Sequence, residues 1–442
     1  MTTYFCELAW LGGERAEADV VVVVDGEEIA SVETGVSSPP ADVTRLGGLT
    51  LPGFANVHSH AFHRALRGRT KTGRGSFWTW REQMYALAAK LDPDTYFRLA
   101  RATFAEMALA GVTAVGEFHY LHHEPGGHRY NDPNEMGRAL IAAANEAGIR
   151  ITLLDACYLH GGFGEPPDEV QQRFSDGDAD VWAERVDRLV TEPDAEVGAA
   201  IHSVRAVDPE ACATVAAWAS DRERPLHAHV SEQPAENEGS LAAFGKTPVA
   251  VLHEAGALSP SFTAIHATHL TDADIGLLGG SGCCCCLCPT TERDLADGIG
   301  PARALADAGA SLSLGSDSHA VIDLLEEARA VELDERLASG ERGRHSAAAL
   351  LRAATADGHA ALGQAAGKLE AGATADLVTI GLDSVRLAGT TAEAALGSVV
   401  FAASAADVRQ VVCGGREIVS DGAHAELDVA AELRNSIAAV LG

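Results

Sequence analysis

Short apolar segments with strand character alternate with helix-like segments along most of the chain. The clearest helical pattern begins at Asp92-Pro93, a capping residue followed by proline at the first helical position, and ends at Gly111; a second begins in the same way at Asp208-Pro209. Eight strands alternating with helices predict an α/β fold of the (β/α)8 TIM barrel type, whose chemistry gathers at the C-terminal ends of its strands. The eight predicted strands are 51–58, 112–119, 149–157, 197–202, 225–230, 262–267, 282–288 and 311–317.

The first and last parts of the chain have β patterns separated by turns. Val20–Val24 is a β-branched run, Asp25-Gly26 is a hairpin-type turn, and Ile29–Thr34 is a second short strand. Strand character returns in 367–380 and 408–419. We therefore expect a small β-sandwich domain that is formed from both chain termini.

The change of pattern predicts where the two domains divide. We assign residues 51–363 to the catalytic barrel, and residues 1–50 together with 364–442 to the small β-sandwich domain. A helix is expected from residue 423 to the end of the chain. Two long connections are expected to cover the C-terminal face of the barrel as insertions: 120–148 and 160–180.

The charge balance limits the kinds of partner that the protein can have. The formal net charge is −30, from 63 acidic and 33 basic residues, which argues against nucleic acid or an anionic membrane as a partner. No apolar run reaches the length of a membrane span and no signal pattern opens the chain, so we expect a cytoplasmic protein. A small anionic substrate would need arginines in its pocket to offset the average field.

Nine cysteines include four in succession, Cys283 to Cys286. Adjacent cysteines rarely bridge each other, and no CxxC pair has a matching partner, so neither disulfides nor a structural zinc site is expected. The run is predicted to be a buried strand of small apolar side chains.

Histidines and carboxylates recur at the ends of the predicted strands. His58 and His60 end the first strand, and because residues i and i+2 of a strand share a face, both imidazoles can point to one site. His229 lies at the end of the fifth strand and Asp317 at the end of the eighth. Nitrogen ligands with one carboxylate suit zinc or ferrous iron that keeps an open position for water. We predict that these four residues hold a metal ion.

Other strand-end histidines have a simpler interpretation. A lone histidine there is more often a structural residue with satisfied hydrogen bonds than a ligand. His266 and His269 are three residues apart and face opposite ways on a strand, so they cannot both point inward, and His269 is given the structural interpretation. The histidines predicted to lie in loops or around the site are His119, His122, His123 and His128.

Taken in order along the chain, these motifs resemble the amidohydrolase superfamily. The resemblance rests on Pro52-Gly-Phe-Ala-Asn-Val-His-Ser-His60, on the histidines of strands five and six, on Gly315-Ser-Asp317 and on the tail Gly367-Lys-Leu-Glu-Ala-Gly-Ala-Thr-Ala-Asp-Leu-Val378. Within the superfamily, five segments are similar to the N-formimidoyl-L-glutamate deiminases, enzymes of histidine degradation that release ammonia to give N-formyl-L-glutamate. These segments are 58–65, 77–82, 117–123, 202–207 and 315–319.

The resemblance implies one zinc ion per subunit, with iron as an alternative, held by His58, His60, His229 and Asp317. Two-metal members of the superfamily use a modified lysine on strand four, where this chain has His202, so a mononuclear site is expected. The resemblance further implies that a metal-bound water, whose pKa falls toward ~7, attacks the C=N carbon of a linear amidine.

Roles for other residues follow from the same resemblance. Asp317 would accept the proton of the attacking water, His266 would orient that water, and Glu232 would pass a proton to the departing nitrogen. Arg81 and Arg205 match positions that bind the two carboxylates of the substrate. The remaining substrate-binding positions are Tyr120, His202 and His63, the last of which stands where we expect glutamine in the family.

Two other functions remain open at this point. A related deaminase acting on a guanine, adenosine or triazine ring would need aromatic or amide contacts to a flat ring, and it would not need two arginines. A non-catalytic assembly protein on the same scaffold would have lost metal ligands, whereas this chain keeps a full candidate set. The resemblance also implies a homodimer.

Overall fold

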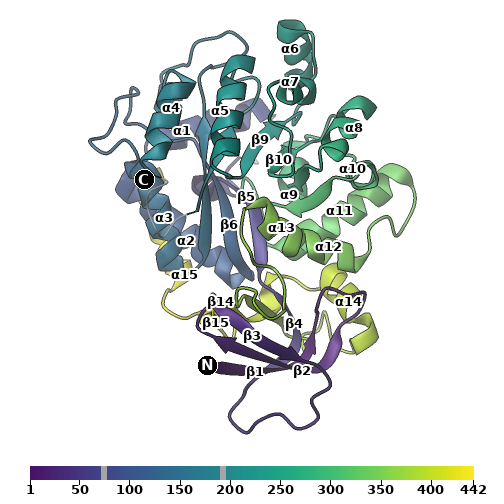
Figure 1. Cartoon of the computed structure of the whole chain (residues 1–442). Helices are drawn as coiled ribbons and strands as arrows, with labels where there is room; N and C mark the ends of the chain where they lie inside the picture. The colour runs from purple at the N-terminus through teal and green to yellow at the C-terminus, as the bar shows by residue number, and fades with distance from the viewer. Residues whose placement is uncertain (71–76, 190–195) are drawn as a thin grey trace.

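Eight parallel strands form one sheet of the computed structural model, which describes residues 1–70, 77–189 and 196–442. They follow one another in chain order with helices between them, and they form the upper part of the molecule in Figure 1. The predicted (β/α)8 barrel is confirmed. Its strands are β5 (Phe54–Ser59), β6 (Val112–His119), β7 (Arg150–Cys157), β8 (Glu196–Ile201), β9 (Leu226–Val230), β10 (Phe262–His266), β11 (Cys284–Leu287) and β12 (Ser311–Leu314).

The barrel helices begin where the sequence provides caps. α2 (Pro93–Leu109) starts with a capping box in which Asp92 and Thr95 exchange side-chain and backbone hydrogen bonds. α5 (Pro209–Asp221) starts at Asp208, whose carboxylate accepts two backbone N–H groups of the first turn. None of the helices in the described ranges combines the length and the apolar character that a bilayer crossing requires. The other helices of this part are α1 (Phe77–Ala88), α3 (Glu135–Ala147), α4 (Ala179–Asp187), α6 (Pro234–Phe244), α7 (Pro248–Glu254), α8 (Asp272–Gly280), α9 (Pro289–Leu295), α10 (Ala302–Ala308), α11 (Leu324–Ser339), α12 (Ala347–Ala354) and α13 (Ala356–Ala361).

The barrel closes where its first and last strands meet. The backbone N–H of Asp317 donates to the carbonyl of His58 at 2.9 Å, and the N–H of His60 donates to the carbonyl of Asp317 at 3.2 Å. Gly315 permits this close approach, since a Cβ there would lie 2.7 Å from the Cβ of His58. The closing hydrogen bonds therefore bring two histidines of the β5 end beside a carboxylate that follows β12.

Both ends of the chain supply a second, mixed sheet. Its strand order is β16-β15-β14-β13-β4-β1-β2-β3, so β4 pairs with the N-terminal β1 on one side and with the C-terminal β13 on the other. This sheet lies below the barrel in Figure 1, and the small β domain predicted from both termini is confirmed. Its strands are β1 (Thr2–Ala9), β2 (Glu17–Asp25), β3 (Glu28–Glu33), β4 (Thr44–Pro52), β13 (Leu377–Ile380), β14 (Val408–Cys413), β15 (Arg416–Ser420) and β16 (Ala423–His424).

The predicted strand 51–58 is divided between the two sheets. β4 ends at Pro52 in the terminal sheet, and β5 begins at Phe54 in the barrel. Gly53 lies between them, where a Cβ would be 2.3 Å from Oγ1 of Thr113. The missing side chain of this glycine therefore lets the chain pass from one sheet to the other.

Two other predicted segments differ from the structure in their boundaries. The connection 120–148 contains the barrel helix α3, so only its first half is a loop over the barrel. The C-terminal helix α15 (Val429–Leu441) begins after Asp428, whose carboxylate accepts a backbone N–H of the first turn, and not at residue 423. Residues 423 and 424 instead form the short edge strand β16.

The predicted β segment 367–380 consists mostly of turns. Gly367 and Gly372 have φ angles of 84° and 85°, in the left-handed region that favours glycine. Only the last four residues of the segment form a strand, β13.

The nine cysteines are all buried and unpaired. The run from Cys283 leads directly into β11, so the predicted buried strand of small side chains is confirmed. Burial raises the pKa of the Cys284 thiol to about 12, which keeps this group protonated and unreactive at neutral pH.

An ion pair between a half-buried arginine and a fully buried aspartate joins the base of the barrel to the terminal sheet. Arg150, at the start of β7, donates to Asp376 from two guanidinium nitrogens, one of them at 2.8 Å. Asp376 also accepts hydrogen bonds from Thr113 Oγ1 and from the N–H of Gly414, each at 2.9 Å. Burial alone would raise the pKa of Asp376, but the hydrogen bonds and the charge of Arg150 outweigh it and lower the pKa below 3.8.

Replacing Asp376 by asparagine should destabilise the protein by about 3 kcal/mol, because Arg150 then loses its buried counter-charge. Since the pKa of Asp376 is lowered in the folded state, the pair contributes stability above the unfolded-state pKa, and this contribution is lost as the pH falls below about 4. Urea unfolding of the wild type and of Asp376→Asn between pH 7 and pH 3 measures the difference in the free energy of unfolding. Asp383→Asn removes the exposed partner of Arg409 and should leave the midpoint unchanged; equal losses in the two variants would contradict this prediction.

Candidate active site

A cavity opens at the C-terminal ends of the barrel strands. Its volume is about 590 Å³, open space at the mouth included, which is within the usual range of small-molecule sites. Every residue assigned to the site from the sequence lines this cavity except His58, which is fully buried. The lining side chains are His60, His63, Trp80, Arg81, Met84, Tyr85, Tyr120, Tyr158, Phe174, His202, Arg205, His229, Glu232, His266, Leu295 and Asp317.

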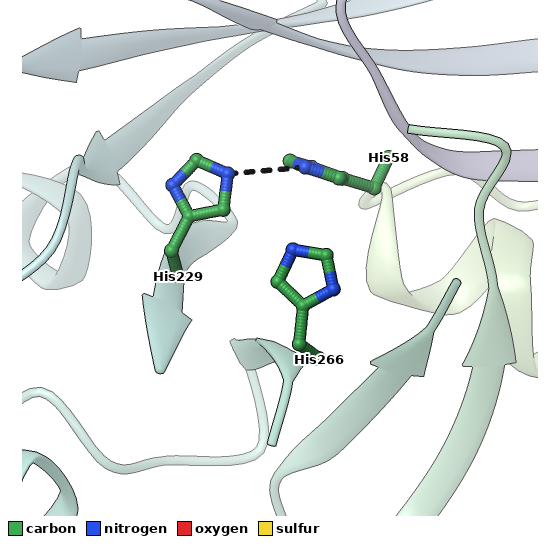
Figure 2. A group of neighbouring side chains, drawn as sticks. All are labelled: His58, His229 and His266. Atoms are coloured by element: carbon green, nitrogen blue, oxygen red, sulfur yellow. Dashed lines mark hydrogen bonds between the residues drawn. The ribbon is translucent and has the colours of Figure 1, made fainter. Parts of the chain in front are cut away.

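The four residues expected to bind metal converge. The Nε2 atoms of His58 and His229 lie 3.1 Å apart (Figure 2). Asp317 Oδ1 lies 3.4 Å from His58 Nε2 and 3.5 Å from His60 Nε2. Tetrahedral zinc with ligands at about 2.0–2.1 Å requires ligand atoms about 3.3–3.4 Å apart. The donor atoms of His58, His60 and Asp317 are therefore close enough together for one ion. His229 adjoins this group at His58, where it also belongs to a second donor group with His266.

Backbone carbonyls orient two of the imidazoles. The Nδ1 atoms of His60 and His229 hydrogen-bond to the carbonyls of Phe118 at 3.0 Å and of His202 at 2.8 Å. A carbonyl only accepts, so each Nδ1 carries the hydrogen and each Nε2 presents a lone pair. Burial lowers the pKa of both imidazoles well below 6.5, which keeps them neutral. These two lone pairs and the nearby Asp317 carboxylate suit a cation.

Residues with a left-handed backbone lie at or just after the ends of three barrel strands. Ser231, His266 and Asp317 have φ angles of 52°, 66° and 43°. Each non-glycine residue in this region costs on the order of 1–3 kcal/mol, and such residues concentrate at functional sites. The turns at the ends of β10 and β12 allow His266 and Asp317 to line the cavity.

His266 lies among three carboxylates. Its Nε2 is 3.8 Å from Glu232 Oε1 and 3.8 Å from Asp317 Oδ2, and its Nδ1 is 3.4 Å from Glu292 Oε1. Burial would lower the pKa of His266, but the neighbouring carboxylates outweigh it and raise this pKa well above 6.5. Burial also raises the pKa of Glu232. Glu232 and His266 can therefore hold and exchange protons beside the metal ligands.

Arginines and tyrosines form another part of the wall. Arg81 Nε donates to Tyr85 OH at 2.7 Å, and Gln171 Nε2 donates to Tyr85 OH at 3.0 Å and to Tyr158 OH at 2.7 Å. Arg205 faces the same cavity, and its guanidinium makes no hydrogen bond or ion pair with the described residues. Arg81 and Arg205 are both cations at this wall of the cavity, so each can bind an anionic group.

His63 and His202 lie close to the ligand histidines. His63 Nε2 is 3.1 Å from Tyr120 OH, and its ring centroid is 4.7 Å from that of His60. His202 supplies the carbonyl that orients His229. Burial lowers the pKa of the His63 and His202 imidazoles well below 6.5, so both are neutral hydrogen-bonding groups in the cavity.

Sequence reasoning missed several residues in or beside the cavity. These residues lie on helices and loops, where strand periodicity carries no information. A clue to one of them was the Cys-Pro step at the end of β11, since Pro289 opens a helix whose first turn carries Glu292. The missed residues are Tyr85, Tyr158, Gln171 and Glu292.

In the segment 77–82, the side chains of Phe77 and Trp78 lie outside the described part of the chain.

A second group of histidines is buried outside the cavity. Donor atoms of His119, His122 and Asp155 lie within 4.8 Å of one another. Arg185, however, already donates to Asp155 at 2.7 and 2.8 Å, and its charge disfavours a metal ion there. His269 bonds to a backbone carbonyl at 2.7 Å and does not line the cavity. These placements agree with a structural role for these histidines.

A (β/α)8 barrel with histidine and carboxylate donors at its strand ends is the architecture of a metal-dependent hydrolase. The chain belongs to the amidohydrolase family, whose profile matches residues 49–418.

Formimidoylglutamate deiminase from Pseudomonas aeruginosa is 40% identical to this chain over 440 residues, which cover 96% of each protein. 5-Methylthioadenosine/S-adenosylhomocysteine deaminase from Natronomonas pharaonis is 30% identical over 425 residues, which cover 95% of this chain and 92% of the relative. The solved structure of an amidohydrolase from Brucella melitensis matches with a TM-score of 0.92 and 33% identity, and covers 100% of both chains. These similarities support a hydrolase that acts on C–N bonds.

Zinc-loaded protein, dialysed free of excess metal, should retain about one zinc ion per chain. His60→Ala should retain well below half of that, because it removes one of four ligand side chains. Elemental analysis of the purified proteins measures the content. His128→Ala changes an exposed histidine outside the cavity and should keep the full amount; two tightly held ions per chain, or equal content in both variants, would count against the site.

Proposed function

We propose that the protein catalyses the zinc-dependent hydrolytic deamination of N-formimidoyl-L-glutamate, giving N-formyl-L-glutamate and ammonia in histidine degradation. The observation that carries the proposal is the pair Arg81 and Arg205 in a cavity that also contains the metal-ligand set. The protein has a net charge of −30, so two cationic side chains at the same cavity point to an anionic substrate. The 40% identical relative from Pseudomonas aeruginosa supports the same substrate.

His58, His60, His229 and Asp317 would hold the zinc ion. When bound, zinc lowers the pKa of a coordinated water toward ~7 and so supplies a nucleophile at neutral pH. Asp317 has its two oxygens in different surroundings, because Oδ1 faces His58 and His60 while Oδ2 faces His266. Oδ2 is thus available to accept the proton of the attacking water.

Proton transfer to the leaving nitrogen needs an acid on the substrate side of the metal. Glu232 is placed for this role, because it lines the cavity and its Oε1 lies 3.8 Å from His266 Nε2. Its raised pKa favours a protonated carboxyl group that can donate. In the first step the water oxygen bonds to the C=N carbon, Asp317 takes one proton of the water, and Glu232 gives its proton to the nitrogen. In the second step the C–N bond breaks, Asp317 passes its proton to the nitrogen, which departs as ammonia, and the remaining hydroxyl proton goes to Glu232 as the formyl C=O forms. His266 stabilises the charge that develops on this oxygen.

The rest of the substrate would be recognised by polar groups away from the metal. Arg81 and Arg205 would bind its two carboxylates with charge-assisted hydrogen bonds. Tyr120 OH and His63 Nε2, which lie 3.1 Å apart, offer neutral hydrogen-bonding groups near the formimino end. His202 provides a further neutral imidazole beside them.

A ring deaminase is the second candidate. Trp80, Tyr120, Tyr158 and Phe174 line the cavity and could contact a flat heterocycle. The relative from Natronomonas pharaonis, a 5-methylthioadenosine/S-adenosylhomocysteine deaminase, supports this reading at lower identity. Such a substrate would leave the two arginines without carboxylates to bind, so we favour the dicarboxylate.

We also propose that the enzyme is a cytoplasmic homodimer that acts on a small molecule and binds neither nucleic acid nor membranes. The acidic net charge supports the last point.

Ammonia release from zinc-loaded protein tests the proposal directly. N-formimidoyl-L-glutamate, S-adenosylhomocysteine, adenosine and guanine are compared at equal concentrations, with kcat/KM as the readout. We expect N-formimidoyl-L-glutamate to exceed each ring substrate by at least about a hundredfold. Turnover of a ring substrate with none of the acyclic amidine would refute the proposal.

Arg205→Ala should lower kcat/KM for N-formimidoyl-L-glutamate by about 30- to 1,000-fold, or about 2–4 kcal/mol, because a charge-assisted hydrogen bond in a desolvated pocket is lost. Steady-state kinetics measure the change. Arg222→Ala, which removes a surface arginine paired with Asp187, is the matched control and should leave kcat/KM unchanged. An unaltered kcat/KM in Arg205→Ala would remove this residue from the substrate site.

A further inference from the structure

We propose that Glu292 is a positioning residue for His266: its carboxylate holds Nδ1 of the imidazole and so aims Nε2 at the reacting groups. The inference rests on the proposed function, since it assigns a role in the same reaction. Glu292 does not line the cavity and would act only through the histidine.

The carboxylate of Glu292 is fixed by two contacts to one oxygen. Oε1 accepts the backbone N–H of Cys288 at 2.8 Å and lies 3.4 Å from Nδ1 of His266. The side chain is buried, with 7% of its surface exposed. A buried carboxylate that is anchored to the backbone at the end of β11 has little freedom to turn away from the histidine.

The Nδ1 atom of His266 has a different kind of partner from that of the ligand histidines. His266 is the last residue of β10 and has a left-handed backbone conformation, with φ of 66°. His60 and His229 have their Nδ1 atoms held by backbone carbonyls, whereas the partner of His266 Nδ1 among the described residues is the side chain of Glu292. When Nδ1–H donates to this carboxylate, Nε2 is the nitrogen that remains for chemistry.

Nε2 of His266, on the other side of the imidazole ring, faces two carboxylates of the site. It lies 3.8 Å from Glu232 Oε1 and 3.8 Å from Asp317 Oδ2. In Figure 2 the His266 ring stands beside His229 and faces the His58–His229 pair. The planes of the His266 and His229 rings differ by 12°. A half-turn of the ring about χ2 would put Cδ2 in the place of Nδ1 and Cε1 in the place of Nε2, and the Glu292 contact opposes that rotation.

The helix that carries Glu292 also supports the turn after β12. Thr291, the preceding residue in α9, accepts the backbone N–H of Ser318 with its Oγ1 at 3.2 Å. Ser318 follows directly after Asp317 in the chain. The first turn of α9 therefore steadies two of the proposed catalytic residues at once, through Glu292 for His266 and through Thr291 for Asp317.

A second metal site is the competing explanation of the same cluster. Donor atoms of His266, Cys288 and Glu292 lie within 4.8 Å of one another. The oxygen of Glu292 that faces His266 already accepts a backbone N–H, which favours the positioning role. Metal content separates the two explanations: a second zinc ion per chain that is lost in Glu292→Ala would overturn the proposal.

A double-mutant cycle tests whether Glu292 acts through His266. We expect Glu292→Ala to lower kcat on N-formimidoyl-L-glutamate by about 10- to 100-fold with little change in KM or in zinc content. In the His266→Ala background, the same substitution should change kcat by less than about twofold, because the group that it positions is absent. Glu292→Gln keeps an acceptor oxygen and should recover part of the loss. Equal losses in the two backgrounds would overturn the proposal.

Imidazole nitrogen shifts test the contact without any substrate. In [15N]histidine-labelled, zinc-loaded wild type at a pH above the pKa of His266, with His266 assigned by its absence in His266→Ala, we expect the neutral ring to carry its proton on Nδ1. Glu292→Ala should shift the two nitrogens toward each other as the tautomers mix, and Glu292→Gln should do so less. The matched control is Glu327→Gln, a buried carboxylate that binds the N–H of Thr290 at 2.9 Å in the same turn of α9 and should leave the His266 signals in place.

The kinetic cycle and the nitrogen-shift measurement distinguish a wrong substrate from a wrong role for Glu292. If the wild-type enzyme does not hydrolyse N-formimidoyl-L-glutamate, the proposed function is wrong, while the nitrogen shifts still report on the contact. Unchanged His266 shifts in Glu292→Ala would refute the positioning role whatever the substrate is.

Discussion

The hydrogen bonds that close the barrel determine the site. The N–H of Asp317 donates to the carbonyl of His58, and the N–H of His60 donates to the carbonyl of Asp317, so the backbone of three ligand residues is joined at one seam. A closed barrel has no free strand edge, and the same closure brings the two ends of the eight-strand sheet together. Gly315 is part of this constraint, since any side chain there would collide with His58. His229 completes the donor set from β9.

A network of buried polar groups also restrains the backbone at this seam. Ser59 lies between His58 and His60 in the chain. Its hydroxyl donates to Glu117 at 2.5 Å and lies 3.2 Å from Nε2 of His319. Glu117 also accepts the N–H of Ala61 at 2.7 Å. Burial raises the pKa of Glu117 to about 8, although both hydrogen bonds lower it. This network links β5, β6 and the turn after β12, and it restrains a region in which Asp317 has a left-handed backbone.

The sequence predicted those parts of the molecule in which a local pattern has one physical meaning. Two-residue spacing put His58 and His60 on one face of a strand, and the alternation of strands and helices indicated the barrel. The division at Gly53 could not be predicted, because it depends on contact with Thr113, 60 positions further along the chain. Glu292 was missed for the same reason, since its relation to His266 exists only after β10 and β11 are side by side. The roles of the site residues still rest on chemistry and family resemblance.

Anomalous diffraction at the zinc edge, from crystals of zinc-loaded protein grown with N-formyl-L-glutamate, tests the central claim most directly. The account predicts one strong peak per chain, bounded by His58, His60, His229 and Asp317, with the product carboxylates on Arg81 and Arg205. A second peak of equal strength, a peak bounded by other residues, or carboxylates bound away from both arginines would contradict it.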